Sequence, residues 1–122
     1  MDELYLAHSS SFDFKSELYL LIRKSKLNQD YEIILPHENY DEPFDSKNCL
    51  KDCKVIIAEV SYPSIGLGIE LGWADLYGVP IIFIYKKGRK ISTSLKVLSN
   101  NFIEYSDVDE LLEKLSFILK DV

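Results

Sequence analysis

The 122-residue sequence has little positive charge, few cysteines and no long run of apolar residues. Its 14 Lys and Arg residues are outnumbered by 20 Asp and Glu residues, which gives a net charge of −6 at pH 7. Binding to the phosphate backbone of a nucleic acid requires clustered cations, so this acidic balance excludes a nucleic-acid polymer as the expected partner. The nearest basic cluster, YKKGRK at residues 85–90, is short, and we expect it to be a solvated turn.

The same shortages exclude a membrane protein and a disulfide scaffold. No apolar run approaches the ~20 residues that span a bilayer, and the acidic start MDELYLAHSS does not resemble a signal peptide. The two cysteines, Cys49 and Cys53, have a spacing that suits one face of a helix and does not resemble a zinc ligand set. We expect reduced thiols in a cytoplasmic protein. Length and a hydrophobic content of 47% predict a single globular domain over residues 1–122.

Segments typical of strands alternate with segments typical of helices. Apolar, β-rich runs predict five strands, at residues 4–7, 31–35, 54–60, 79–85 and 101–105. Helical spacing predicts four helices, at residues 12–27, 45–53, 66–78 and 107–122, the last capped by Ser106 or Asp107. This alternation predicts an α/β fold, namely a flavodoxin-like, doubly wound, five-stranded parallel sheet of order 2-1-3-4-5.

The carboxyl ends of the predicted strands collect unusual polar residues. Ligands of doubly wound sheets bind at this edge. One such end is SYPSIGLGIELGWA at residues 61–74, in which Gly66 and Gly68 let the backbone approach a ligand closely. Glu70 follows, near a helix start whose free N–H groups favour negative charge. Spacing alone leaves two interpretations of Glu70 open: a carboxylate that serves a ligand, or an acid that caps its own helix.

The helix that carries Glu70 is apolar on two sides. One side holds Ile69, Trp73, Leu76 and Tyr77, and the other holds Leu67, Leu71 and Ala74. A helix with two apolar sides needs two partners. One is its own sheet, and the second is expected to be another copy of the protein, with Trp73 and Tyr77 facing outward. We therefore expect a homodimer.

The segment VIIAEVSYPSIGLGIELGWA at residues 55–74 resembles the signature of the nucleoside 2-deoxyribosyltransferase superfamily, which includes the 2'-deoxynucleoside 5'-phosphate N-hydrolases. LYLAHS and the closing strand and helix also fit this family, whose fold is flavodoxin-like. The resemblance implies a small nucleoside or nucleotide substrate. It also implies that Glu70 is a nucleophile that attacks C1' of a deoxyribose, and that Tyr5 orients its carboxylate. The alternative for Tyr5 is a strand aromatic whose hydroxyl lies in solvent.

Three serines match places that contact phosphate in the hydrolases of this family. Ser64 stands six residues before Glu70, where the nucleoside transferases carry an Asp for the sugar 5'-hydroxyl. An Asp would repel a phosphate, whereas a Ser hydroxyl donates to it. Ser9 and Ser92 match two further serines, and the counterpart of Ser92 comes from the neighbouring subunit. Any one serine is also ordinary in a loop, so the match of all three favours a nucleotide substrate.

Two positions depart from the family pattern. Ser11 stands where the hydrolases have an Arg that pairs with phosphate. Ser46 stands where the family has an Asp that protonates the leaving base, with Asp45 one residue away. A shift of one residue makes Asp45 the general acid, while the alternative is that Asp45 only caps a helix.

Other polar residues receive lesser assignments. Glu59 ends the third strand and is expected to support the site without acting as nucleophile. His37 follows the second strand, where the base pocket of the family begins. His8 and His37 both follow strands, but no third ligand accompanies them, so no metal and no cofactor are expected.

The sequence thus predicts an N-glycosidase acting on a 2'-deoxynucleoside 5'-monophosphate, in a homodimer with shared active sites. Two alternatives stay open. One is a nucleoside 2-deoxyribosyltransferase that exchanges bases between deoxynucleosides. The other is a nucleotide-sensing domain without turnover, because the general acid is uncertain.

Overall fold

The computed structural model describes residues 1–38 and 45–122. These residues contain one sheet, formed by β1 (Glu3–His8), β2 (Glu32–Ile34), β3 (Val55–Glu59), β4 (Ile81–Lys86) and β5 (Phe102–Tyr105). The strand order is β2-β1-β3-β4-β5, and every neighbouring pair is parallel. The predicted α/β class, strand order and flavodoxin-like topology are confirmed.

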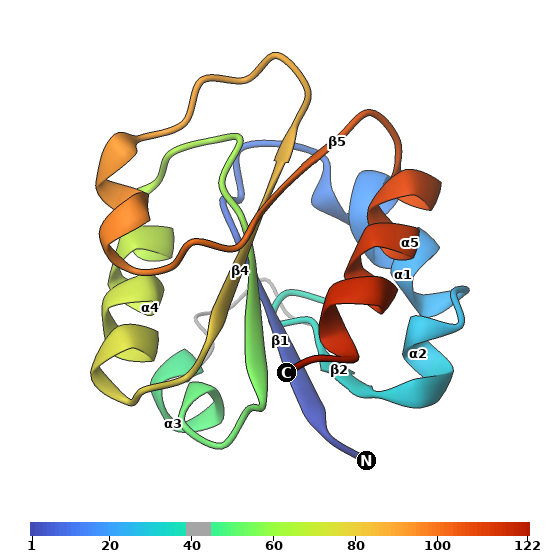
Figure 1. The fold of residues 1–122 in the computed structure, drawn as a ribbon, viewed down its shortest axis with the longest axis horizontal. Coiled ribbons are helices and arrows are strands. Elements are labelled where there is room, and N and C mark those ends of the chain that lie inside the picture. Colours follow the sequence, from blue (N-terminus) through green and yellow to red (C-terminus); the bar gives the residue numbers. More distant parts are fainter. Residues whose placement is uncertain (39–44) are drawn as a thin grey trace.

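Helices cover both faces of the sheet (Figure 1). One face carries α3 (Ser46–Leu50), α4 (Ile65–Leu76) and the 3₁₀-helix η2 (Thr93–Val97). The other carries the π-helix η1 (Lys15–Tyr19), α1 (Leu20–Arg23), α2 (Leu27–Asp30) and α5 (Val108–Leu119). None of the helices described here has the length and apolar character needed to cross a membrane.

The alternation of side chains along β1 divides the core into two clusters. Leu4 and Leu6 pack with the layer that contains α1 and α5, whereas Tyr5 and Ala7 face the layer that contains α3 and α4. Successive side chains of a strand point to opposite faces of the sheet. Neighbouring residues of β1 therefore belong to different layers, and Tyr5 is fully buried beneath α4.

The prediction of one continuous helix over residues 12–27 was wrong. The segment is helical over Lys15–Arg23, where η1 continues directly into α1, and α2 starts only at Leu27. Continuity ends after Arg23, where the Ser25 hydroxyl donates to the Ile22 carbonyl at 2.6 Å and the Ser25 N–H donates to the same oxygen at 3.1 Å. A serine side chain that bonds to a nearby carbonyl competes with the helical ladder, which accounts for the break.

The N-terminus of α5 is capped by Asp107 rather than by Ser106. Asp107 has an extended backbone, and its Oδ1 accepts a hydrogen bond from the Glu110 N–H at 2.8 Å. The helix then buries Leu111, Leu115 and Leu119 against the sheet. Of the two caps considered from the sequence, the structure selects Asp107.

Asp107→Ala is expected to lower the free energy of unfolding by about 1 kcal/mol, because the Glu110 N–H loses its acceptor. Asp107→Asn keeps a side-chain oxygen at the cap and should lose only part of that stability. Urea denaturation followed by circular dichroism measures both variants. Equal losses in the two variants would contradict the cap assignment.

Candidate active site

The helix α4 is oriented by its cap and by three buried side chains. Ser64 precedes it with an extended backbone, and its Oγ accepts a hydrogen bond from the Leu67 N–H at 3.2 Å. Leu67, Leu71 and Ala74 face the sheet, as the helical spacing predicted. Glu70 lies more than one turn inside the helix. The cap is therefore Ser64, and the interpretation of Glu70 as the cap of its own helix is wrong.

Glu70 instead meets the hydroxyl group of Tyr5. The Tyr5 hydroxyl donates to Glu70 Oε2 at 2.5 Å, and it lies 2.9 Å from Ser46 Oγ. Tyr5 comes from the middle of β1 and Ser46 from the first residue of α3, so three elements converge on one carboxylate. The other interpretation of Tyr5, a strand aromatic whose hydroxyl lies in solvent, is therefore wrong.

Two opposing effects act on the Glu70 carboxyl. Burial raises its pKa above the usual value, while hydrogen bonds from Tyr5 and Ser46 and the charge of His37 lower it. Burial, and the neighbouring Glu70 charge, raise the pKa of the Tyr5 hydroxyl, so Tyr5 remains a proton donor. A partly desolvated carboxylate that is held in place by hydrogen bonds is suited to nucleophilic attack.

Asp45 lies outside this hydrogen-bonded group. It is exposed, occupies the N-cap place of α3 without making a side-chain cap bond, and its Oδ2 accepts from Asn48 Nδ2 at 2.7 Å. Ser46, at the position matched to the general acid of the family, is the residue that contacts Tyr5. No hydrogen bond found among the described residues joins Asp45 to Tyr5 or Glu70.

His37 and Ser9 lie at the carboxyl ends of β2 and β1. The His37 N–H donates to the Tyr19 hydroxyl oxygen at 3.3 Å, and its charge acts on Glu70. Ser9 is buried, and its Oγ lies 2.8 Å from Ser11 Oγ and accepts from the Ser11 N–H at 3.1 Å. The residue that replaces the expected arginine, Ser11, therefore folds back onto Ser9.

Ser64 and Ser92 line one small cavity of about 140 Å³, together with Gly68 and Leu71 of α4. Glu70 is not among the residues that line it, because Glu70 points to the flank of α4 next to α3 and β1. Ser92 is exposed and caps η2 by accepting from the Ser94 N–H. Ser92 and Glu70 of one chain thus lie on different flanks of α4.

The two glycines of the site face open space. A Cβ added at Gly66 or Gly68 would meet no atom within 4 Å. Both positions leave the start of α4 accessible to a ligand. The close approach of a ligand stays a prediction, and neither glycine adopts a backbone conformation that requires glycine.

A layer of aromatic rings beside the site was missed from the sequence. Phe12 stacks on Tyr62 with ring centroids 4.7 Å apart, and Lys86 Nζ lies 5.1 Å and 5.0 Å from these rings. The Arg89 guanidinium lies 4.5 Å from the Tyr62 ring and donates to the Ser61 carbonyl. The basic turn therefore contacts the aromatic layer. Residues 87–90 are exposed, as predicted for a solvated turn, whereas Lys86 is half-buried and ends β4.

Glu59 belongs to a separate, fully buried pair. Its Oε1 accepts from the Ser61 N–H at 2.6 Å, and its Oε2 accepts from the Tyr105 hydroxyl. Tyr105 packs in the cluster that contains α5, on the face opposite to Glu70. Its contacts are those of a structural partner. Within residues 1–38 and 45–122, no group of three His, Cys, Asp or Glu side chains is placed to hold a metal ion.

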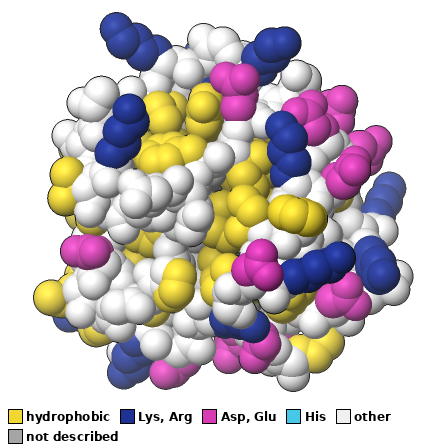
Figure 2. All heavy atoms as spheres, in the orientation of Figure 1, with side chains coloured by type: hydrophobic (Ala, Val, Ile, Leu, Met, Phe, Trp, Pro, Cys, Tyr) yellow, Lys and Arg dark blue, Asp and Glu magenta, His cyan; other side chains and the backbone are white. Residues whose placement is uncertain are grey.

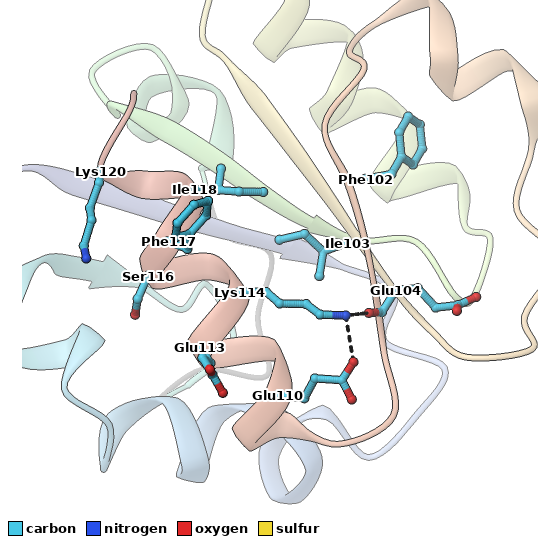
Figure 3. A pocket seen from close by; sticks show the side chains of 10 residues that line it. All are labelled: Phe102, Ile103, Glu104, Glu110, Glu113, Lys114, Ser116, Phe117, Ile118 and Lys120. Carbon is cyan, nitrogen blue, oxygen red and sulfur yellow. Dashed lines mark hydrogen bonds and ion pairs between the residues drawn. The ribbon is translucent and has the colours of Figure 1, made fainter.

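A larger hollow lies away from these residues, between α5 and β5 (Figure 3). Its volume is about 970 Å³, and Lys114 on its wall donates to Glu110 and to the Glu104 carbonyl. Figure 2 shows the molecule in the orientation of Figure 1. Hydrophobic side chains gather in the middle of this face, between the two helical layers, and charged side chains surround them. None of the candidate site residues lines this hollow.

Comparison with curated proteins gives relatives that are all named as N-hydrolases, although no family model matches the chain. A Thermofilum pendens protein with the provisional name 2'-deoxynucleoside 5'-phosphate N-hydrolase 1 is 41% identical over 75 residues, which are 57% of this chain and 52% of the relative. A Syntrophotalea carbinolica protein of the same name is 31% identical over 103 residues, which are 74% of this chain and 72% of the relative. The 5-hydroxymethyl-dUMP N-hydrolase of Rattus norvegicus is 39% identical over 51 residues, 40% of this chain and 31% of the relative.

Solved structures with the same fold agree with these relatives. A Clostridium botulinum CMP N-glycosidase has a TM-score of 0.68 and 25% identity, and the match covers 94% of this chain and 99% of that one. A Leishmania mexicana 2-deoxyribosyltransferase, with a TM-score of 0.63 and 16% identity over 85% of this chain and 90% of that one, shows the shared fold. The chain spans about half the length of the T. pendens relative but 72% of the S. carbinolica one. The resemblance inferred from the sequence is confirmed: this chain belongs to the family of the 2'-deoxynucleoside 5'-phosphate N-hydrolases.

Proposed function

We propose that this protein is an N-glycosidase that hydrolyses the bond between the base and the sugar of a 2'-deoxynucleoside 5'-monophosphate. The observation that carries the proposal is the half-buried Glu70 carboxylate held by the Tyr5 hydroxyl, in a chain of this family. The names of the relatives and of the C. botulinum neighbour support a nucleotide substrate. Two free thiols, Cys49 and Cys53, fit a reducing compartment such as the cytoplasm.

The first chemical step is attack by Glu70 on C1' of the sugar. Tyr5 donates to Oε2, which leaves Oε1 to form the new bond to C1'. The bond from C1' to the base nitrogen breaks, and the base leaves with the electron pair. The base takes up a proton, and we assign Asp45 as its donor because Asp45 adjoins Ser46, which contacts Tyr5.

The second step returns the enzyme to its starting state. A water molecule attacks C1' and gives one proton to the Asp45 carboxylate, which restores the acid, and the bond between C1' and Glu70 Oε1 breaks. The products are the free base and 2-deoxyribose 5-phosphate. The Tyr5 hydroxyl stabilises the carboxylate as a leaving group, because a hydrogen bond to the charged form favours it.

The phosphate group is assigned to the start of α4. The Ser64 Oγ accepts from Leu67, so its own proton is available to donate to a phosphate oxygen. The first N–H groups of a helix attract an anion, and Gly66 and Gly68 leave the approach open. Ser9, at the end of β1, is proposed as a second donor, and His37 as part of the base pocket.

Glu70→Ala is expected to lower turnover by at least ~10³-fold, equivalent to about 4 kcal/mol in the activation barrier. The control Asp75→Ala changes an exposed acid on the same helix and should keep wild-type turnover. Release of free base from a panel of deoxynucleoside monophosphates, followed by chromatography, measures both. Activity within tenfold of wild type in Glu70→Ala would remove Glu70 as the nucleophile.

Ser64→Asp is expected to lower the preference for a monophosphate over its nucleoside by at least about tenfold, because a carboxylate repels the phosphate. Ser64→Ala introduces no charge and should show a smaller change. The ratio of kcat/KM for the two substrates is the measurement. If the unmutated protein cleaves nucleosides as well as monophosphates, or passes the sugar to an added second base, the transferase alternative is favoured.

We further propose a homodimer in which each site uses both chains. Three large apolar side chains of α4, namely Ile65, Ile69 and Leu76, point outward and are 86%, 48% and 79% exposed. Trp73 and Tyr77 are partly covered by their own chain, so they are not the fully outward residues expected from the sequence. The counterpart of Ser92 in the family comes from the neighbouring subunit, and on that resemblance we assign the phosphate contact of Ser92 to the site of the other copy. Within one chain Ser92 lines the same cavity as Ser64.

Mixing Glu70→Ala with Ser92→Asp is expected to restore activity that neither variant has alone. Random exchange makes half of the dimers mixed, and each mixed dimer has one intact site of two, so recovery approaches about a quarter of wild-type activity. Turnover is measured before and after subunit exchange. A monomer with full activity at micromolar concentration, or no recovery on mixing, contradicts shared sites.

A further inference from the structure

Arg89 lies in the turn after β4, and its side chain is held in one place although the residue is exposed. Its Nε and Nη2 donate to the Ser61 carbonyl oxygen at 3.2 Å and 3.1 Å. The guanidinium carbon lies 4.5 Å from the centroid of the Tyr62 ring, a cation–π contact, and Phe12 stacks on the same ring. An exposed arginine loses side-chain entropy when it binds, so a guanidinium that is already fixed is preorganised for a ligand.

The Ser61 carbonyl group that receives these bonds belongs to a rigid part of the chain. Ser61 is 1% exposed, and its N–H donates to Glu59 Oε1 at 2.6 Å. Its Oγ accepts from the Lys86 N–H at 2.7 Å. The N–H, hydroxyl oxygen and carbonyl oxygen of Ser61 are therefore all hydrogen-bonded. Arg89 is thus tied to a fixed point that lies three residues before Ser64.

The positive charge of Arg89 has no carboxylate partner among the residues that the structure describes. Arg23 and Lys86, by contrast, pair with Glu38 and Glu17 at 2.7 Å and 2.6 Å. A carbonyl oxygen carries no net charge, so the two bonds that Arg89 makes leave its own charge unbalanced. Its Nη1 donates to none of the described residues and has two N–H groups to offer.

Arg89 stands between the two segments that carry proposed phosphate contacts. Its anchor Ser61 precedes Ser64 by three residues, and Ser92, three residues after Arg89, lines the same cavity as Ser64. The proposed phosphate donors Ser9, Ser64 and Ser92 are all neutral. A phosphate bound by these hydroxyls alone would lack a charged partner, and hydrogen bonds from a cation to an anion are about twice as strong as neutral ones.

We propose that Arg89 is a specificity-determining residue that supplies the positive charge for the 5'-phosphate of the substrate. Nη1 donates to a phosphate oxygen while Nε and Nη2 stay on the Ser61 carbonyl. Arg89 thereby favours phosphorylated substrates over nucleosides and takes no part in breaking the bond to the base. The inference rests on the proposed function, because it concerns the phosphate of the same substrate.

The test measures the binding of 2-deoxyribose 5-phosphate and of 2-deoxyribose, by titration followed by NMR, so it needs neither turnover nor knowledge of the base. Arg89→Ala is expected to weaken binding of the phosphorylated sugar by at least about tenfold, because a charge-assisted hydrogen bond is lost. Binding of 2-deoxyribose should not change. The control Lys87→Ala removes the same charge from the same turn, where Lys87 lines a hollow with Asp107, and should leave both affinities unchanged.

Two further variants separate the charge from the fastening of the loop. Arg89→Lys and Arg89→Gln both keep a donor for the Ser61 carbonyl, but only lysine keeps the charge. Arg89→Lys should therefore retain more affinity for 2-deoxyribose 5-phosphate than Arg89→Gln. In turnover, KM for the monophosphate should rise from wild type to Arg89→Lys to Arg89→Gln, with kcat little changed.

Three results overturn the proposal while the proposed function stands. They are equal binding of 2-deoxyribose 5-phosphate by wild type and Arg89→Ala, equal losses in Arg89→Lys and Arg89→Gln, and an equal loss in the control Lys87→Ala. A wild-type protein that binds the two sugars equally well has no phosphate site. That result removes the nucleotide substrate of the proposed function together with this inference, so the two failures are distinguishable.

Discussion

The hydrogen bond from Tyr5 to Glu70 is the contact on which the candidate site depends. It joins residues 65 positions apart, one in the middle of β1 and the other in α4. Because β1 lies beside β3 in the sheet, the helix that follows β3 crosses over β1 and brings Glu70 above Tyr5. Without the phenol, Glu70 would lose a hydrogen bond that opposes the effect of burial, and its neutral form, which is not a nucleophile, would be favoured more strongly.

The sheet carries two Tyr–Glu pairs with different consequences. Glu59 and Tyr105 lie on the face covered by α5, where Glu59 is fully buried and also binds the Ser61 N–H. Glu70 lies on the opposite face and is only partly covered, more than one turn inside α4. The same two residue types thus form a structural contact in one place and present an accessible carboxylate in the other. The two pairs differ in how far solvent can reach the carboxylate.

The sequence predicted the elements that local patterns specify. Near-continuous apolar runs identified the buried parallel strands, and the strand ends located the segment that leads to Glu70 at the ligand-binding edge. Tyr5 was assigned to the site by the family resemblance. It did not predict the break at Ser25 or the contact between His8 and Tyr19, because a side-chain bond to a carbonyl and a contact across segments leave no periodic signal. The partial burial of Trp73 depends on neighbouring segments, which helical spacing cannot show.

The most direct test of the central claim is to trap the intermediate on Glu70. A 2'-deoxynucleoside 5'-monophosphate that turns over slowly is mixed with the protein, the reaction is quenched in acid, and the digested protein is examined by mass spectrometry. The account predicts a deoxyribosyl phosphate adduct on the peptide that contains Glu70, which is absent from Glu70→Gln. Turnover of the substrate with no adduct at Glu70 under any quench time, or an adduct on another residue, would contradict it.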